Sequence, residues 1–261
     1  MKAQKFTKFL AMMLVVVLLL GMIPFNAVAA VIDFTDSSDG YYNLISKQDW
    51  DAHETSWDFG TNPLVALRNR FMEEGDPQTS FTLSAFVNEF KTLWESRFNQ
   101  LHANEEELNR QFIEIYGLQD ELTPDVPKSE ITILQQGEIS VEDDQILWND
   151  AVLIKQLISY AIGVTVGRYR LDRPGLHIAH PAPTSDELAA YDYCGKSVEI
   201  DDDAIIPILP DDSPFADNLC NRVKEFIRLV FGDDMLTANL NYSEQALGKP
   251  INDYLQKDFY T

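Results

Sequence analysis

Apolar positions in the middle of the chain repeat with the period of an α-helix. Between Thr79 and Tyr116, one stripe repeats every seven residues and comprises Trp94, Leu101, Leu108 and Ile115. Phe98 and Phe112 occupy an adjoining position of this repeat, and Glu105 is the polar exception between them. The pattern predicts a long helix within residues 79–127 that ends at Gly117. It is typical of the buried face of a helix in a hairpin or bundle, and the alternative is a coiled-coil arm.

The remaining hydrophobic pattern predicts shorter helices separated by irregular segments. One helix should begin near Asn149 or Asp150 and end around two glycines, Gly163 and Gly167. Another should run from a Ser213 cap and Pro214 in its first turn to Gly232, and two short helices should flank the glycine and proline at 248 and 250. Residues 130–140 suit a short strand and turn. We therefore expect a mainly α fold, helical and loop-rich with little strand.

Composition shifts suggest four intervals along the chain. Residues 1–30 join a lysine-bearing start, a continuous apolar run and a small-residue end, which is typical of a secretory signal peptide or N-terminal leader. An uncleaved membrane anchor is the alternative. Residues 31–78 read as a loop-rich segment anchored by aromatic side chains, 79–127 as the long helix with its hairpin or coiled-coil option, and 128–261 as a helical C-terminal domain.

The charge balance limits the partners of this chain. Its 261 residues contain 42 acidic and 20 basic side chains, for a formal net charge of -22. Such a surface keeps a protein soluble but repels nucleic acid over most of its area. DNA binding by the chain alone would therefore need a local basic patch. The densest one comprises Arg168, Arg170 and Arg173, whose guanidinium forks suit phosphate oxygens. The alternative is that these arginines pair with the chain's own carboxylates.

Cysteine and histidine positions offer little chemistry. Cys194 and Cys220 could form one disulfide if the chain is exported, but they follow no C-x-x-C pattern. His177 and His180 lack the spacing of a structural zinc site. The run of acids at 201–203 lacks the alternation and central glycine of a calcium loop. We therefore predict no metal site.

The sequence contains no recognisable catalytic motif. It has no G-x-S-x-G nucleophile elbow, no phosphate-binding P-loop and no dinucleotide-binding G-x-G-x-x-G. Its carboxylates are so numerous that any acid–base pair chosen among them would be arbitrary. We therefore assign no catalytic residue from the sequence.

Six blocks of the chain nevertheless resemble one known family when taken in order. They are "ISKQDWDAHETSWDF", "FNQLHANEEELNRQFIEIYGLQDELTPDV", "ISYAIGVTVGRYRLDRPGL", "IIPIL", "RVKEFIRLVFG" and "ALGKPINDYLQKDFY". Together they are similar to the C-terminal region of the adenine-specific DNA methyltransferase of BREX phage-defence systems, the PglX family. The likeness runs from about Tyr42 to Thr261. The resemblance implies DNA and other BREX subunits as partners, and it implies a cytoplasmic location.

The resemblance does not carry the family's chemistry onto this chain. Family members methylate adenine N6 with S-adenosylmethionine, which needs a glycine-rich cofactor loop and an Asn/Asp-Pro-Pro-Tyr/Phe motif around the flipped base. The nearest string here, Asn62-Pro63-Leu64, lacks the second proline and the aromatic residue. We therefore expect no cofactor in this chain and a noncatalytic role in DNA docking or subunit assembly. The leader supports a different function, that of an exported acidic helical binding protein.

Overall fold

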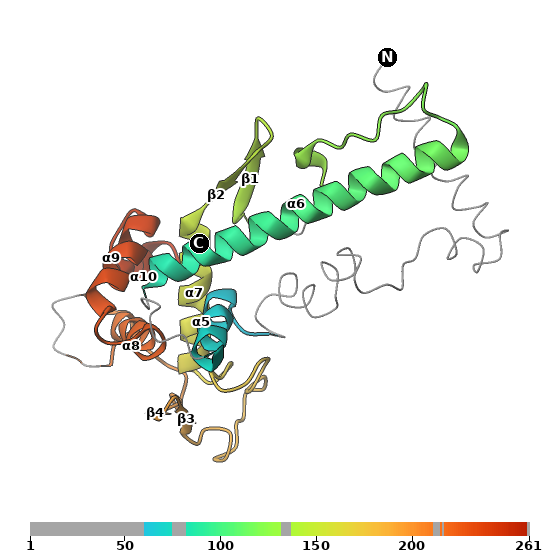
Figure 1. Cartoon of the computed structure of the whole chain (residues 1–261). Helices are drawn as coiled ribbons and strands as arrows, with labels where there is room; N and C mark the ends of the chain where they lie inside the picture. Colours follow the sequence, from blue (N-terminus) through green and yellow to red (C-terminus); the bar gives the residue numbers. More distant parts are fainter. Residues whose placement is uncertain (1–59, 75–81, 132–136, 211–214, 216, 260–261) are drawn as a thin grey trace. The chain divides into compact units, whose positions relative to one another are not determined.

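The computed structural model describes residues 60–74, 82–131, 137–210, 215 and 217–259 (Figure 1). These residues all lie in one compact unit, Lys47–Thr261. The expected leader at 1–30 lies outside the described residues, as do Trp50, Trp57 and Phe59 of the segment expected to be anchored by aromatics. The intervals 79–127 and 128–261 both fall within the one unit.

The described part of the chain is mainly α, as the sequence predicts. Its helices are α5 (Pro63–Glu74), α6 (Leu83–Tyr116), α7 (Asp150–Thr165), α8 (Leu219–Phe231), α9 (Leu236–Leu247) and α10 (Ile251–Lys257), with a short 3-10 helix η2 (Lys128–Glu130). The strands are β1 (Ile139–Glu142), β2 (Gln145–Trp148), β3 (Tyr191–Tyr193) and β4 (Lys196–Val198). They form two antiparallel hairpins, β1–β2 and β3–β4.

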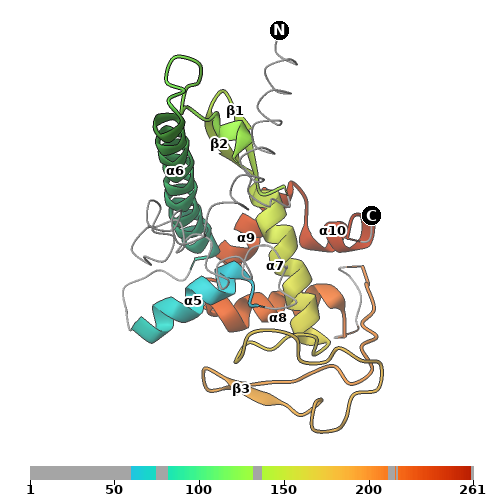
Figure 2. The same ribbon diagram turned by 90° about the vertical axis from the view of Figure 1, so that its right-hand side faces the viewer.

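Helix α7 lies at the centre of the helical core. It packs against α8 and α9, and α10 packs against both of those helices (Figures 1 and 2). Half of its sixteen residues are buried, on nearly all sides of the helix, which is why its sequence is so uniformly apolar. Asp150, the first residue of α7, forms an ion pair with Lys91 on α6 at 2.5 Å. Its carboxylate also accepts a hydrogen bond from the Tyr242 hydroxyl on α9 at 2.8 Å. One carboxylate therefore links three helices.

Helix α6 is anchored in the core at its N-terminal end. Its first two turns bury Leu83, Phe86, Val87 and Phe90. Thr82 caps this end by accepting a hydrogen bond from the Ala85 amide, and Gly117 ends the helix in the left-handed conformation predicted from the sequence. After Gly117 the chain folds back along α6, where the Val126 amide donates to Glu106 and the Val126 carbonyl lies 2.6 Å from His102 Nε2. The irregular segment after the long helix therefore packs back against its C-terminal half.

Three local expectations need correction. Helix α8 begins at Leu219, not near Ser213, because the Asn218 side chain caps it by accepting from the Cys220 amide. Gly163 lies inside α7, which continues to Thr165. The interval 31–78, expected as loop-rich, contains helix α5. Residues 211–214, which include the expected cap, lie outside the described residues.

Candidate functional site

Two glycines at the end of α7 allow the following corner to fold onto the helix. A Cβ atom at Gly163 would lie 2.4 Å from the Tyr169 ring, so only glycine fits beneath that ring. Tyr169 stacks on Tyr160 with ring centroids 5.1 Å apart. Gly167 has a φ of +73°, and a Cβ there would lie 2.7 Å from Ile178 and from Ile200. The glycine pair therefore serves close packing.

The three arginines of the corner are engaged within the chain in different ways. Arg170 forms a bidentate pair with Asp172, at 2.7 and 2.6 Å, and its guanidinium lies 4.0 Å from the centroid of the Tyr191 ring. The hydrogen bond from Arg170 holds the pKa of the Asp172 carboxyl below its usual range. Arg168 and Arg173 are exposed. Arg168 donates to the Tyr169 hydroxyl, and Arg173 contacts the His177 ring. Phosphate contact by these arginines stays a prediction.

A buried guanidinium on α5 connects that helix to the β3–β4 hairpin. Arg68 is 6% exposed and donates to the Tyr193 hydroxyl at 2.8 Å and to Cys194 Sγ at 3.3 Å. Burial raises the pKa of Tyr193 to about 12, so its hydroxyl stays neutral and able to hydrogen bond. This contact could not be predicted from the sequence, because Arg68 and its partners are more than a hundred positions apart.

The two cysteines are both free in the structure. Cys194 is exposed in the turn of the β3–β4 hairpin, with a φ of 53°. Cys220 is buried in the first turn of α8. In the structure one thiol thus faces solvent and the other belongs to the core, and the disulfide expected on export stays a prediction.

The two histidines both contact Glu187. His177 Nε2 lies 2.8 Å from the Glu187 carbonyl oxygen, and His180 Nε2 lies 3.0 Å from the Glu187 carboxylate. That carboxylate also accepts from the Thr184 amide and hydroxyl, both at 2.8 Å. In the described residues, the one group of three metal-ligating side chains is the acidic run Asp201 to Asp203, and exposed acids often cluster in this way without an ion.

This arrangement predicts a pH-dependent loop. Hydrogen bonds from Thr184, followed by that from His180, lower the pKa of Glu187 from 4.5 to about 2. Since the folded pKa is depressed, the stabilisation is present above pH 4.5 and is lost as the pH falls towards 2. NMR titration should show the Thr184 amide shifting over this acidic range, and Glu187→Gln should abolish that shift. A Thr184 amide that titrates equally in the variant would contradict the assignment.

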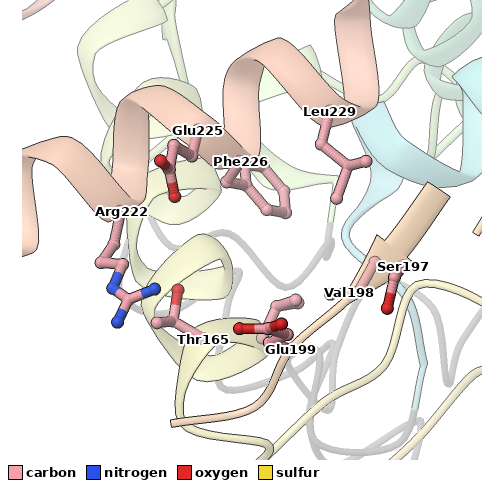
Figure 3. A pocket seen from close by; sticks show the side chains of 9 residues that line it. Thr165, Ser197, Val198, Glu199, Arg222, Glu225, Phe226 and Leu229 are labelled. Atoms are coloured by element: carbon pink, nitrogen blue, oxygen red, sulfur yellow. The ribbon is translucent and has the colours of Figure 1, made fainter. Parts of the chain in front are cut away.

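A pocket of about 260 Å³ opens between the end of α7, strand β4 and helix α8 (Figure 3). Its apolar lining comprises Val164, Val198, Phe226 and Leu229. Its polar lining comprises Thr165, Ser197, Glu199, Arg222 and Glu225. Three segments far apart in the sequence therefore build one cavity, which analysis of the sequence missed.

The charged side chains around this pocket differ in how many partners they have. Arg222 lies 3.3 Å from Asp217 and 3.7 Å from Asp201, while its buried Nε has no hydrogen-bond partner in the described structure. The Asp201 carboxylate is largely buried, and burial, followed by its hydrogen bond with Asp203, raises its pKa. Glu199 and Glu225 are exposed at the rim. The pocket therefore combines apolar and polar lining residues, and two exposed carboxylates are among them.

Comparison with known proteins identifies the relatives of this chain. It is 35% identical over 224 residues to "Adenine-specific methyltransferase PglX" of Lacticaseibacillus casei (strain Zhang), a match covering 82% of this chain and 16% of that protein. It is 32% identical over 206 residues to "Adenine-specific methyltransferase BrxX" of Escherichia coli O9:H4 (strain HS), covering 78% of this chain and 16% of that protein. The chain is a relative of part of the PglX and BrxX methyltransferases. No protein-family model matches it.

The relationship to PglX and BrxX confirms the resemblance drawn from the ordered sequence blocks. The chain spans about a sixth of the length of these methyltransferases, since both matches cover 16% of the relative. The block "GRYRLDRPG" is the glycine- and arginine-bearing corner beside α7. Within the described residues, none of the helices combines the length and the apolar character needed to cross a membrane.

Proposed function

We propose that this chain is a noncatalytic, C-terminal part of a BREX-type adenine-specific DNA methyltransferase, which aids DNA docking or subunit assembly. The supporting observation is the match to PglX over 82% of this chain and only 16% of the methyltransferase. The sequence has no glycine-rich cofactor loop and no Asn-Pro-Pro-Tyr motif. Binding of S-adenosylmethionine and extrusion of adenine would then be tasks for the rest of such an enzyme.

Complementation in trans tests this proposal. A PglX-type methyltransferase lacking the matching segment should lose adenine methylation and regain it when this chain is added. The chain alone should transfer no methyl group from S-adenosylmethionine to DNA. Gly60→Ala serves as a matched variant, because a Cβ at Gly60 meets nothing within 4 Å and should leave complementation intact. Methyl transfer by the chain alone, or full activity of the shortened enzyme, would contradict the proposal.

The arginine corner provides a separate test of DNA docking. Arg168→Ala with Arg173→Ala should weaken DNA binding by the complemented enzyme and reduce the slope of log K against log salt by about 2. Arg170 is kept, because its pair with Asp172 belongs to the fold. Arg70→Ala with Arg110→Ala removes the same charge from other exposed sites. If the slope were unchanged in the Arg168→Ala, Arg173→Ala variant, these arginines would not contact DNA phosphates and would instead pair with side chains of the chain itself.

The leader at residues 1–30 supports a second candidate function, an exported acidic helical binding protein. Cell fractionation with mass spectrometry of the N-terminus distinguishes the two. Export predicts a mature chain outside the cytoplasm that has lost Met1. A cytoplasmic chain that keeps Met1 would exclude export.

A further inference from the structure

The pocket between α7, β4 and α8 carries two carboxylates that the fold does not use. Within the described residues, Glu199 and Glu225 form no ion pair or hydrogen bond through their side chains, although both line the pocket. Arg222, the one cation in its lining, is already shared by Asp201 and Asp217. The pocket is therefore left with uncompensated negative charge, which favours a cationic ligand.

Part of the lining of the same pocket is apolar. Val198 and the Phe226 ring are buried beneath the rim, and Leu229 is half-buried beside them (Figure 3). A small hydrated metal ion would gain nothing from such a surface, whereas an aliphatic stem would bury its methylene groups there. The ligand should thus combine an apolar stem with a positively charged head.

Two carboxylates from different elements suit a planar, forked head with several donors. Glu199 follows strand β4, and Glu225 comes from helix α8, so the two acids approach the pocket from different elements. A guanidinium has five N–H donors in a fixed fork and can pair with two carboxylates. An ammonium offers the same charge without the fork.

We propose that this pocket receives an arginine side chain from a partner polypeptide. Strand β4 pairs only with β3 in the described part of the chain, and its Ser197 and Val198 line the pocket. The backbone of an extended segment can therefore hydrogen bond beside the pocket while its arginine enters. This inference concerns binding alone and does not depend on the methyltransferase proposal.

The test is a binding measurement on the whole chain. A tripeptide Ac-Val-Arg-Val-NH₂ is titrated and followed by ¹H–¹⁵N NMR at the amides of Thr165 and Glu199, beside the analogue in which neutral citrulline replaces arginine. The arginine peptide should bind saturably, at least about tenfold more tightly than both the citrulline peptide and free arginine amide. Equal binding of the two peptides would overturn the proposal. Equal binding of free arginine amide would also overturn it, by assigning the pocket to a small molecule.

Matched variants locate the interaction. Glu199→Gln with Glu225→Gln should weaken the arginine peptide at least about tenfold. Glu89→Gln with Glu114→Gln removes the same charge from exposed positions on α6 and should leave binding unchanged. Circular dichroism and Tm should be equal for the two double variants. Equal weakening in both would show general charge attraction and overturn the assignment to this pocket.

Discussion

Replacing Gly163 by alanine should lower the free energy of unfolding by about 1–3 kcal/mol, because the new methyl group would overlap the ring of Tyr169. A Cβ atom 2.4 Å from the Tyr169 ring is far inside van der Waals contact, and Tyr160 is stacked against that ring. Tyr160 is fully buried, so the pair of rings has little room to move away from the helix. Chemical denaturation measures the effect directly.

Two further variants separate this clash from a general cost of alanine. Gly60→Ala should change stability by less than about 0.5 kcal/mol, because its Cβ would meet open space. In a Tyr169→Ala background, Gly163→Ala should lose most of its effect, since the ring that it strikes has been removed. If the cost of Gly163→Ala were the same with and without the Tyr169 ring, the proposed origin would be wrong.

Replacing Asn239 by leucine should cost about 2–3 kcal/mol of stability. Asn239 is completely buried on α9, and its side-chain oxygen accepts a 2.7 Å hydrogen bond from the Leu83 amide at the start of α6. The first amides of a helix have no partner within the helix, so this side chain satisfies one of them from a neighbouring element. Leucine offers no acceptor, so that buried N–H is left unsatisfied. Thermal and denaturant unfolding both report the loss.

The neighbouring cap provides the comparison. Thr82→Ala removes the side-chain acceptor for the Ala85 amide at a less buried site and should cost only about 1 kcal/mol. Hydrogen exchange should show the first turn of α6 opening more often in Asn239→Leu than in Thr82→Ala. Equal stability losses in the two variants would mean that burial of the Asn239 contact adds nothing.

The long helix and its end were predictable from the sequence because their signals are local. Apolar spacing marks α6, and Gly117 provides a left-handed end that other residues adopt poorly. The start of α8 was mispredicted because Ser213-Pro214 carries the same local signal as the actual cap, Asn218. Local chemistry could not choose between them, and the choice depends on where the helix meets the core.

The sites were predictable only as far as their residues are neighbours in sequence. The arginine cluster is visible in the chain, yet its contacts with Asp172 and Tyr191 follow from how the loop after α7 folds. Arg68 reaches Cys194, and Glu225 shares a pocket with Glu199, only because separate segments converge on the core. The spacing of residues along the chain contains no information about such contacts between distant segments.

The anchoring of α6 at one end has a mechanical consequence. A helix of 34 residues is about 50 Å long, and its first two turns supply most of its core contacts. A tilt of about 5° where it leaves the core would carry its far end through about 4 Å over that length. A binding partner that touches both this tip and the pocket beside α8 would therefore sense small rotations of the helix as large displacements.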